Sequence, residues 1–279
     1  MIDLIKLDYI PDNWTKDQIK IYEIYSEYFA DNNDSVNPEA IEELEKILLR
    51  WLEESQLKIV SWNCNGKFRE KFRDIADEDA DIYVIQECEN PAESNEEDYK
   101  EFAGDNYFWT GNLHYKGLGI FAKEDIKIEK LEYSGEFEHF ILVRVNDSFN
   151  LLGVWAMPKY VEMIHDFFDA NEGLFDENLV MCGDFNSSVV FNYHHPKAKN
   201  HTVLNKKLES KKLKSVYHDL TGDKQGEEKA MTFYQARHLN NPFHLDLVYA
   251  GENVVKEFTI LDHFRWITIS DHLPLVFKI

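Results

Sequence analysis

Residues 178–187 read Asn-Leu-Val-Met-Cys-Gly-Asp-Phe-Asn-Ser, an apolar run that ends abruptly in polar side chains. Short, continuously apolar runs bounded by turn-forming residues are typical of buried strands. Asp184 and Asn186 stand at the end of this predicted strand, which is where α/β folds place their binding sites. The stretch therefore predicts a buried strand with chemically useful side chains at its carboxyl end.

Strand-like runs lie on both sides of this stretch, from residue 57 onward. They are residues 57–63, 81–87, 117–123, 139–145, 149–157, 243–249, 255–261 and 274–279. The spacing of apolar residues predicts helices at 67–78, 159–172 and around 202–212, whereas the acidic stretch 89–101 is predicted to be a solvated loop. Interleaved strands and helices, with several hairpin-like neighbours, predict a mixed α/β domain with two sheets.

Residues 1–56 have a different pattern, which predicts two amphipathic helices. Thr15 and Gln18 resemble a capping box at the start of the first helix, and Asn37 with Pro38 is a typical start for the second. Two helices of this size cannot bury both apolar stripes alone. We expect this N-terminal extension to dock on the larger domain, residues 57–279, or to serve as an interaction surface. The sequence identifies no protein partner.

Charge narrows the classes of function. The chain has 279 residues with 52 acidic and 30 basic side chains, which gives a formal net charge of −22. A nucleic-acid coat protein or a peripheral protein of anionic membranes needs a broad basic face, so both are disfavoured. An enzyme that handles phosphate with the help of a metal ion remains compatible with this charge.

The three cysteines, Cys64, Cys88 and Cys182, lie far apart and include no C-x-x-C pair. A disulfide framework and a structural zinc site are therefore disfavoured. The first ten residues contain acidic side chains where a signal peptide needs basic ones, and no apolar stretch reaches the length of a membrane span. We expect a soluble, cytoplasmic protein.

Polar motifs occur at four further places along the predicted strands. They are residues 61–66 (SWNCNG), 86–87 (QE), 244–246 (HLD) and 270–274 (SDHLP). Together with GDFNS at 183–187, in this order and spacing, they resemble the endonuclease/exonuclease/phosphatase (DNase I-like) superfamily. The resemblance covers residues 57–279. It implies a catalytic domain built as a four-layer sandwich, with two mixed β-sheets face to face and helices outside, and hydrolysis of phosphate esters assisted by Mg²⁺ or Mn²⁺.

The same resemblance implies a set of metal ligands. Glu87 corresponds to the main metal-binding carboxylate, Asn65 lies beside the metal directly or through water, and Asp271 lies on the other flank. These side chains suit the ion, because Mg²⁺ prefers hard oxygen ligands and keeps several waters. Asn65 departs from the pattern, since an aspartate often fills this position in apurinic endonucleases and an amide is a weaker metal ligand.

The catalytic residues implied by the resemblance are Asp184, Asn186, Asp246 and His272. Asp184 would position or deprotonate the attacking water, and Asn186 would hold the water or a phosphate oxygen. His272 would contact the phosphoryl oxygen, while Asp246 fixes the tautomer of its ring and favours the imidazolium. Asn63 would donate to the substrate phosphate or support Asp184.

Two positions leave alternatives open. His244 lies two residues before Asp246 and so on the same strand face, where it would bind substrate or be a core histidine. The segment Trp155-Ala156-Met157-Pro158 lacks the His or Tyr that many family members place before this proline. Lys159, Tyr160 or His165 would replace that group, or metal-bound water would protonate the leaving group.

Substrate clues come from residues 194–218, which contain seven lysines and a single glutamate. This basic run would grip a polyanion, or it would be a solvated helix that balances charge elsewhere. The leading hypothesis is a Mg²⁺-dependent nuclease that acts on DNA or RNA. The alternatives are a phosphohydrolase acting on a small-molecule or lipid phosphate ester, and a catalytically silent binding module that kept the fold.

Overall fold

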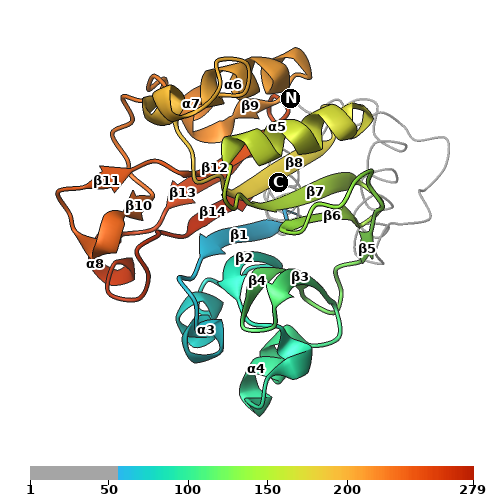
Figure 1. Cartoon of the computed structure of the whole chain (residues 1–279). Coiled ribbons are helices and arrows are strands. Elements are labelled where there is room, and N and C mark those ends of the chain that lie inside the picture. Colours follow the sequence, from blue (N-terminus) through green and yellow to red (C-terminus); the bar gives the residue numbers. More distant parts are fainter. Residues whose placement is uncertain (1–55) are drawn as a thin grey trace, which may run out of the picture. The chain divides into compact units, whose positions relative to one another are not determined.

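The computed structural model describes residues 56–279. The two helices predicted before residue 57 lie outside the described residues, so the N-terminal extension and its boundary stay predictions. From residue 57 onward the chain forms the α/β domain described below (Figure 1).

The first sheet contains six strands in the order β13-β14-β1-β2-β4-β3. In chain order these are β1 (Lys58–Asn63), β2 (Ile82–Cys88), β3 (Tyr107–Leu113), β4 (Lys116–Ala122), β13 (Glu257–Ile260) and β14 (Leu275–Lys278). β1 and β2 are parallel, and the other neighbours are antiparallel. The sheet is therefore mixed, as the sequence predicts.

The second sheet also contains six strands, in the order β5-β6-β7-β8-β12-β9. They are β5 (Ile128–Lys130), β6 (Phe140–Val145), β7 (Phe149–Trp155), β8 (Leu179–Asp184), β9 (Lys214–Ser215) and β12 (Asp246–Ala250). β7 and β8 are parallel and the remaining pairs are antiparallel. A separate two-stranded ribbon joins β10 (Phe233–Tyr234) to β11 (Pro242–Phe243).

Helices cover the outer face of each sheet, which gives four layers (Figure 1). α3 (Phe68–Ala76), α4 (Glu97–Ala103) and α8 (His263–Trp266) accompany the first sheet, whereas α5 (Val161–Ala170), α6 (His201–Ser210) and α7 (Val216–Thr221) accompany the second. A central apolar cluster joins the sheets, with Val84 of β2 and Val180 of β8 among its fully buried members. The predicted four-layer sandwich is confirmed.

The three predicted helices of this domain correspond to α3, α5 and α6. The acidic stretch 89–101 is different, because a short 3₁₀ turn and α4 replace the predicted loop. Tyr99 and Ala103 of α4 are buried, and the Tyr99 ring packs edge-on against Phe68 at 5.7 Å between ring centres. The prediction of a solvated loop was wrong, since a few apolar positions suffice to anchor an otherwise acidic helix.

The pairing of β7 with β8 depends on Gly183. This residue has φ of +144°, and a Cβ atom built on it would lie 1.9 Å from the carbonyl oxygen of Val154. No side chain fits at that distance, so glycine allows the two parallel strands to approach each other just before Asp184. The close approach fixes the position of the strand end that carries the polar motif.

Buried histidines make the stability of this domain depend on pH. Burial lowers the pKa of His139, His165, His201 and His244, because a charged imidazolium loses its hydration inside the protein. The largest shift with a stated value is that of His201 on α6, whose pKa falls to about 3. Its ring contacts the Ser187 hydroxyl at 3.1 Å and the Tyr249 hydroxyl at 3.3 Å.

We expect His201 to make a destabilising contribution as the pH falls below about 6.5, because the unfolded chain then binds a proton that folded His201 still refuses. This contribution should reduce the free energy of unfolding by about 3 kcal/mol between pH 7 and pH 4. Urea denaturation of wild type and variants at several pH values measures it. His201→Asn should remove the contribution from the pH dependence, whereas His238→Asn, at an exposed histidine, should not change the pH dependence. Equal slopes for wild type and His201→Asn would contradict the assignment.

Candidate active site

The polar ends of β1, β2 and β8 meet through the side chain of Asn63. Its Nδ2 donates to Asp184 Oδ2 at 2.9 Å and lies 3.4 Å from Glu87 Oε1. Asn63 and Glu87 belong to the first sheet and Asp184 to the second. One buried amide therefore links the two sheets at the edge where their polar strand ends converge.

Glu87 reaches this edge because β2 is irregular at its end. The register between β2 and β4 shifts between Gln86 and Cys88, and Glu87 adopts a left-handed conformation with φ of +65°. Such bulges redirect a side chain that a regular strand would place on the opposite face. The Glu87 carboxylate lies near Asn63, and its Oε2 forms an ion pair with Lys116 Nζ at 2.8 Å.

Asp184 is completely buried and is held on both carboxylate oxygens. Oδ1 accepts from the backbone N–H of Asn186 at 2.8 Å, and Oδ2 accepts from Asn186 Nδ2 at 2.9 Å. Asn186 Nδ2 also donates to the Ala156 carbonyl at 3.0 Å, and its backbone is left-handed with φ of +46°. The turn after β8 thus folds the asparagine back onto the aspartate.

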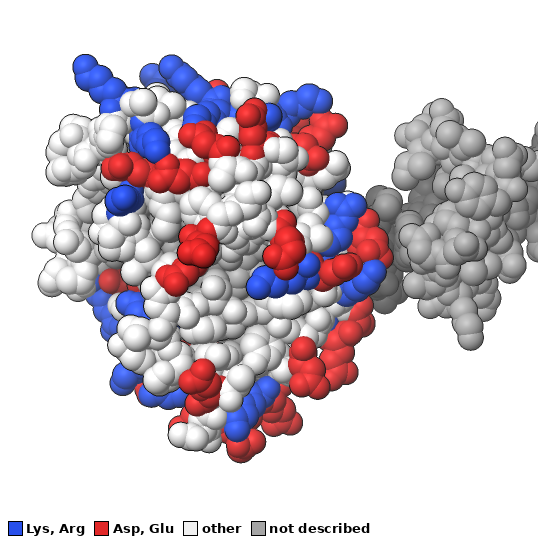
Figure 2. Space-filling model, turned by 45° about the vertical axis from the view of Figure 1, so that its right-hand side comes forward, with Lys and Arg blue, Asp and Glu red and all other residues white. Residues whose placement is uncertain are grey.

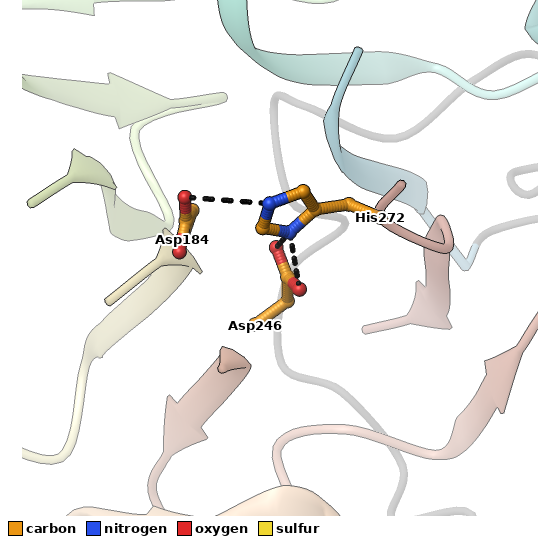
Figure 3. Close-up of side chains that lie close together, drawn as sticks. All are labelled: Asp184, Asp246 and His272. Atoms are coloured by element: carbon orange, nitrogen blue, oxygen red, sulfur yellow. Dashed lines mark hydrogen bonds and ion pairs between the residues drawn. The ribbon is translucent and has the colours of Figure 1, made fainter. Parts of the chain in front are cut away.

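His272 lies between two aspartates (Figure 3). Its Nδ1 contacts Asp246 Oδ2 at 2.9 Å, and its Nε2 lies 4.0 Å from Asp184 Oδ2. Asp246 comes opposite Asp184 because β12 and β8 pair with these residues in register. Asp246 and Leu245 donate their backbone N–H groups to the Thr232 hydroxyl, each at 2.9 Å. These contacts bring together all four predicted catalytic residues.

The charges of this group are strongly coupled. Burial alone would lower the pKa of His272, but the carboxylates of Asp246 and Asp184 raise it to about 10, so the ring is an imidazolium at neutral pH. Burial and the charge of Asp246 raise the pKa of Asp184 to about 7, although His272 acts in the opposite direction. Asp184 therefore exchanges its proton near neutral pH, which suits a general base.

The predicted metal ligands lie at the more open side of this network. Asp271 is partly buried, and burial raises the pKa of its carboxyl, with a smaller contribution from the negative charge of Glu87. Asn65 is exposed, and its backbone N–H donates to Asn63 Oδ1 at 3.0 Å. Within residues 56–279, no hydrogen bond joins the side-chain oxygens of Asn65 or Asp271 to the Asp184 group.

Asp184, Asp246 and His272 also form a group whose metal-ligating atoms all lie within 4.8 Å of one another. One contact favours an ion network over a metal site here. His272 Nδ1 lies 2.9 Å from Asp246 Oδ2, so this ring nitrogen is already engaged. Asp246 already accepts from His272, so the group is a self-contained ion network.

His244 lies outside this network. Its Nδ1 contacts the Ala230 carbonyl at 2.8 Å, and its ring packs against Tyr217 at 4.5 Å between ring centres. The ring is almost completely buried, and no hydrogen bond within the described residues joins it to the other predicted site residues. Of the two interpretations open for His244, the geometry favours the core histidine.

The basic run at residues 194–218 is largely neutralised. Five of its lysines form ion pairs with acidic side chains. The pairs are Lys199–Asp166, Lys207–Asp169, Lys211–Glu172, Lys212–Glu177 and Lys214–Asp219. On the face drawn in Figure 2, basic and acidic side chains are likewise mixed among the coloured residues. The geometry favours the interpretation that this run balances acidic charge on the same domain. It disfavours the interpretation that the run binds a polyanion.

The segment after β7 presents no side chain of the expected kind to the site. The Ala156 carbonyl is occupied by Asn186, and Lys159 and Tyr160 lie in an exposed turn, both with positive φ. His165 on α5 is completely buried, and its Nε2 contacts the Asn200 carbonyl at 3.1 Å. Of the three substitutes considered from sequence, His165 is turned into the helical layer.

Two residues of this site carry no signal in the sequence. Thr232 orients the start of β12 through its hydroxyl, and Lys116 pairs with Glu87 from the neighbouring hairpin. Thr232 lies 14 residues from Asp246 along the chain and Lys116 lies 29 residues from Glu87, and neither belongs to one of the quoted motifs. Strand pairing alone brings them to the site, so periodicity and motif spacing could not have found them.

Comparison with known proteins gives a family match and many structural neighbours. A model of the endonuclease/exonuclease/phosphatase family matches residues 60–272. A search of curated protein sequences finds no match. None of the helices described in residues 56–279 is long and apolar enough to cross a membrane.

Solved structures similar to this chain share its fold at low sequence identity. The 3′ phosphatase NExo from Neisseria, bound to a product DNA hairpin, is 17% identical over 79% of this chain and 98% of its own, with a TM-score of 0.56. An AP endonuclease from Archaeoglobus fulgidus is 19% identical over the same shares, also with a TM-score of 0.56. The human Nocturnin catalytic domain is 17% identical over 80% of this chain and 92% of its own, with a TM-score of 0.52.

The Asp246 carboxylate should be the main cause of the raised His272 pKa. Asp246→Asn keeps a hydrogen-bond acceptor but removes the charge, so the pKa of His272 should fall by roughly one to three units. NMR titration of the imidazole resonances measures this directly. Asp262→Asn, next to the partly exposed His263, is the matched control and should leave the titration of His272 unchanged. A His272 pKa that is the same in Asp246→Asn and wild type would refute this account.

Proposed function

Because this chain belongs to the endonuclease/exonuclease/phosphatase family, we propose that it is a metal-dependent phosphodiesterase that cleaves nucleic acid. The match over residues 60–272 confirms the family predicted from the motifs, and the family's enzymes are hydrolases that act on phosphate esters. The observation that carries the proposal is the double contact of Asn63, which lies within hydrogen-bonding reach of Glu87 and Asp184 at once.

The side chains around Glu87 fit a divalent metal ion. Glu87, Asp271 and Asn65 offer only oxygen donors of the hard type that Mg²⁺ and Mn²⁺ prefer. The Glu87 carboxylate already attracts one cation, the Lys116 ammonium at 2.8 Å. These three residues would hold the metal, with Glu87 as the main ligand. A bound Mg²⁺ supplies Lewis-acid stabilisation of the negative charge on phosphoryl oxygens.

Asp184 would serve as the general base. Its pKa of about 7 gives it a substantial ionised fraction at neutral pH, and Asn63 and Asn186 hold both of its oxygens in place. A carboxylate fixed in this way can orient a water molecule and accept its proton as the water attacks phosphorus. Asn186 would orient the water or a phosphate oxygen through its amide.

His272 would stabilise negative charge that develops on the phosphoryl oxygens. The imidazolium is kept charged by Asp246 at 2.9 Å, which also fixes the orientation of the ring. A fixed cation in a buried site lowers the barrier because the oxygens gain charge between the ground state and the transition state. Asp184 would thus act on the attacking water, and His272 would act on the phosphate.

Nucleic acid is the substrate class that the comparisons favour. Structures similar to this chain include a 3′ phosphatase bound to a product DNA hairpin and two AP endonucleases. The second candidate is a small-molecule or lipid phosphate ester, which is supported by the net charge of −22 and by the ion-paired lysines of residues 194–218. The retained set of polar side chains, from Asn63 to His272, supports an active enzyme over a silent binding module.

We further propose that the protein works in the cytoplasm. All three cysteines are buried free thiols, which supports a reducing compartment.

Asp184→Asn should reduce phosphodiesterase activity on the order of 10²–10⁴-fold, because the amide cannot accept the proton of water. Activity is measured with Mg²⁺ or Mn²⁺ on labelled single-stranded DNA, duplex DNA, abasic duplex, RNA and a chromogenic phosphodiester. Asp166→Asn removes an acidic side chain from α5 and should leave the rate unchanged. Cleavage of the chromogenic ester alone would support the small-phosphate candidate, and no cleavage of any substrate would contradict phosphoester hydrolysis.

Chelation of divalent ions should abolish the activity, and added Mg²⁺ or Mn²⁺ should restore it. Glu87→Gln should weaken Mn²⁺ binding by at least about tenfold, a loss that mutation of even outer-shell partners can produce at metal sites. Calorimetric titration with Mn²⁺ in the absence of substrate gives the affinity. Glu97→Gln, on the exposed side of α4, is the matched control. Equal Mn²⁺ affinities for Glu87→Gln and wild type would remove Glu87 from the ligand set.

A further inference from the structure

Lys116 is a cation of the site that no sequence motif includes. It begins β4 at the end of the β3–β4 hairpin, and its Nζ lies 2.8 Å from Glu87 Oε2. The same ammonium stands 5.5 Å from the centre of the Trp155 ring, a distance typical of cation–π contacts. Trp155 ends β7 and pairs in register with Asp184. Lys116 therefore lies between the metal-binding carboxylate and the strand next to the proposed base.

Three other basic side chains near this edge are engaged elsewhere. Lys71 donates to the Cys64 carbonyl at 2.6 Å, Arg69 pairs with Glu89, and Arg237 donates to the carbonyls of Thr268 and Ile269. Within residues 56–279, Lys116 forms its ion pair with Glu87. Its charge is thus balanced by the carboxylate that a metal ion would also use.

Glu87 would hold a metal ion with the same carboxylate that now pairs with Lys116. Because two cations that share one carboxylate repel each other, the Lys116 ammonium would then lose part of its attraction to Glu87. The Trp155 ring offers a weak alternative that stabilises a cation without neutralising it. An anionic phosphate oxygen that enters beside the metal is a stronger partner, because a charge-assisted hydrogen bond combines contact with full charge.

We propose that Lys116 is a phosphate-binding residue of the active site, which exchanges Glu87 for an oxygen of the substrate phosphate when metal and substrate are bound. This inference rests on the proposed function, since it places a phosphate ester beside Glu87. It gives the site a mobile cation on the side of β7, where the segment from Trp155 to Pro158 supplies no charged side chain. The fixed imidazolium of His272 lies on the side of β12.

Three variants test the proposal. Lys116→Met keeps most of the apolar stem and removes the charge, whereas Lys116→Arg keeps the charge. Lys123→Met is the matched control, because Lys123 follows the other end of β4, is similarly exposed (40% against 42% of the side chain) and also pairs with carboxylates, those of Asp79 and Asp81. Thermal unfolding establishes that each variant is folded.

The first measurement is calorimetric binding of inorganic phosphate to the full chain saturated with Mn²⁺. Lys116→Met should weaken phosphate binding roughly 10–100-fold, the size expected for a lost hydrogen bond to a charged group. Lys116→Arg should retain most of the affinity, and Lys123→Met all of it. Mn²⁺ binding without phosphate should be as tight in Lys116→Met as in wild type, or tighter, because a competing cation is gone.

The second measurement is kcat/KM on the best substrate of the panel, which decides the case if phosphate binds wild type too weakly for calorimetry. Lys116→Met should lower kcat/KM by a similar 10–100-fold factor. Tighter Mn²⁺ binding with unchanged phosphate affinity and unchanged kcat/KM would overturn the proposal, since Lys116 would then only replace the absent metal. If wild type neither binds phosphate nor cleaves any ester, the proposed function fails as a whole.

Discussion

The site depends on one buried side chain, the amide of Asn63. The side-chain N–H groups of Asn63 point to Asp184 and Glu87, and its Oδ1 accepts from the backbone N–H of Asn65. The backbone carbonyl of Asn63 accepts from the Ser270 hydroxyl at 2.8 Å. Buried polar atoms are costly unless they are paired, so this residue ties four chain segments into a single arrangement. The arrangement keeps Asp184, the proposed general base, apart from Glu87, the proposed metal-binding carboxylate, and couples the two carboxylates through one amide.

Much of this arrangement could be predicted from the sequence because the strands are apolar runs that end in polar residues. The apolar runs before Asp184 and Glu87 predict where β8 and β2 end, and the packing of the two sheets against each other brings these ends to one edge. The helical and strand-like periods along the chain predict a mixed α/β domain with two sheets, whereas the four-layer order was implied by the resemblance to the family. The orientation of Glu87 could not be predicted, since it depends on a bulge whose register shift leaves no pattern in the sequence.

Charge was the least predictable property. The lysines of residues 194–218 form a basic run in the sequence, yet their partners come from α5, α7 and the loop before β8. For the same reason the role of Lys116 could not be predicted, since its partner Glu87 lies on the neighbouring strand. The helix α4 could not be predicted either, because the burial of Tyr99 anchors a segment that is otherwise rich in acidic residues. In each case tertiary packing decides which charges cancel, so local composition misleads.

Gly183 also determines what can be inferred from any chain that shares this motif. The glycine is required by the backbone of Val154 rather than by the reaction, so a descendant that lost its chemistry would still need it for folding. Asp184, in contrast, is buried at a free-energy cost that its hydrogen bonds to Asn63 and Asn186 reduce, and the fold itself does not require a carboxylate there. An inactive paralogue should therefore keep the glycine, whereas its aspartate can be substituted. In the Gly-Asp pair, the aspartate, and never the glycine, is the marker of a working enzyme.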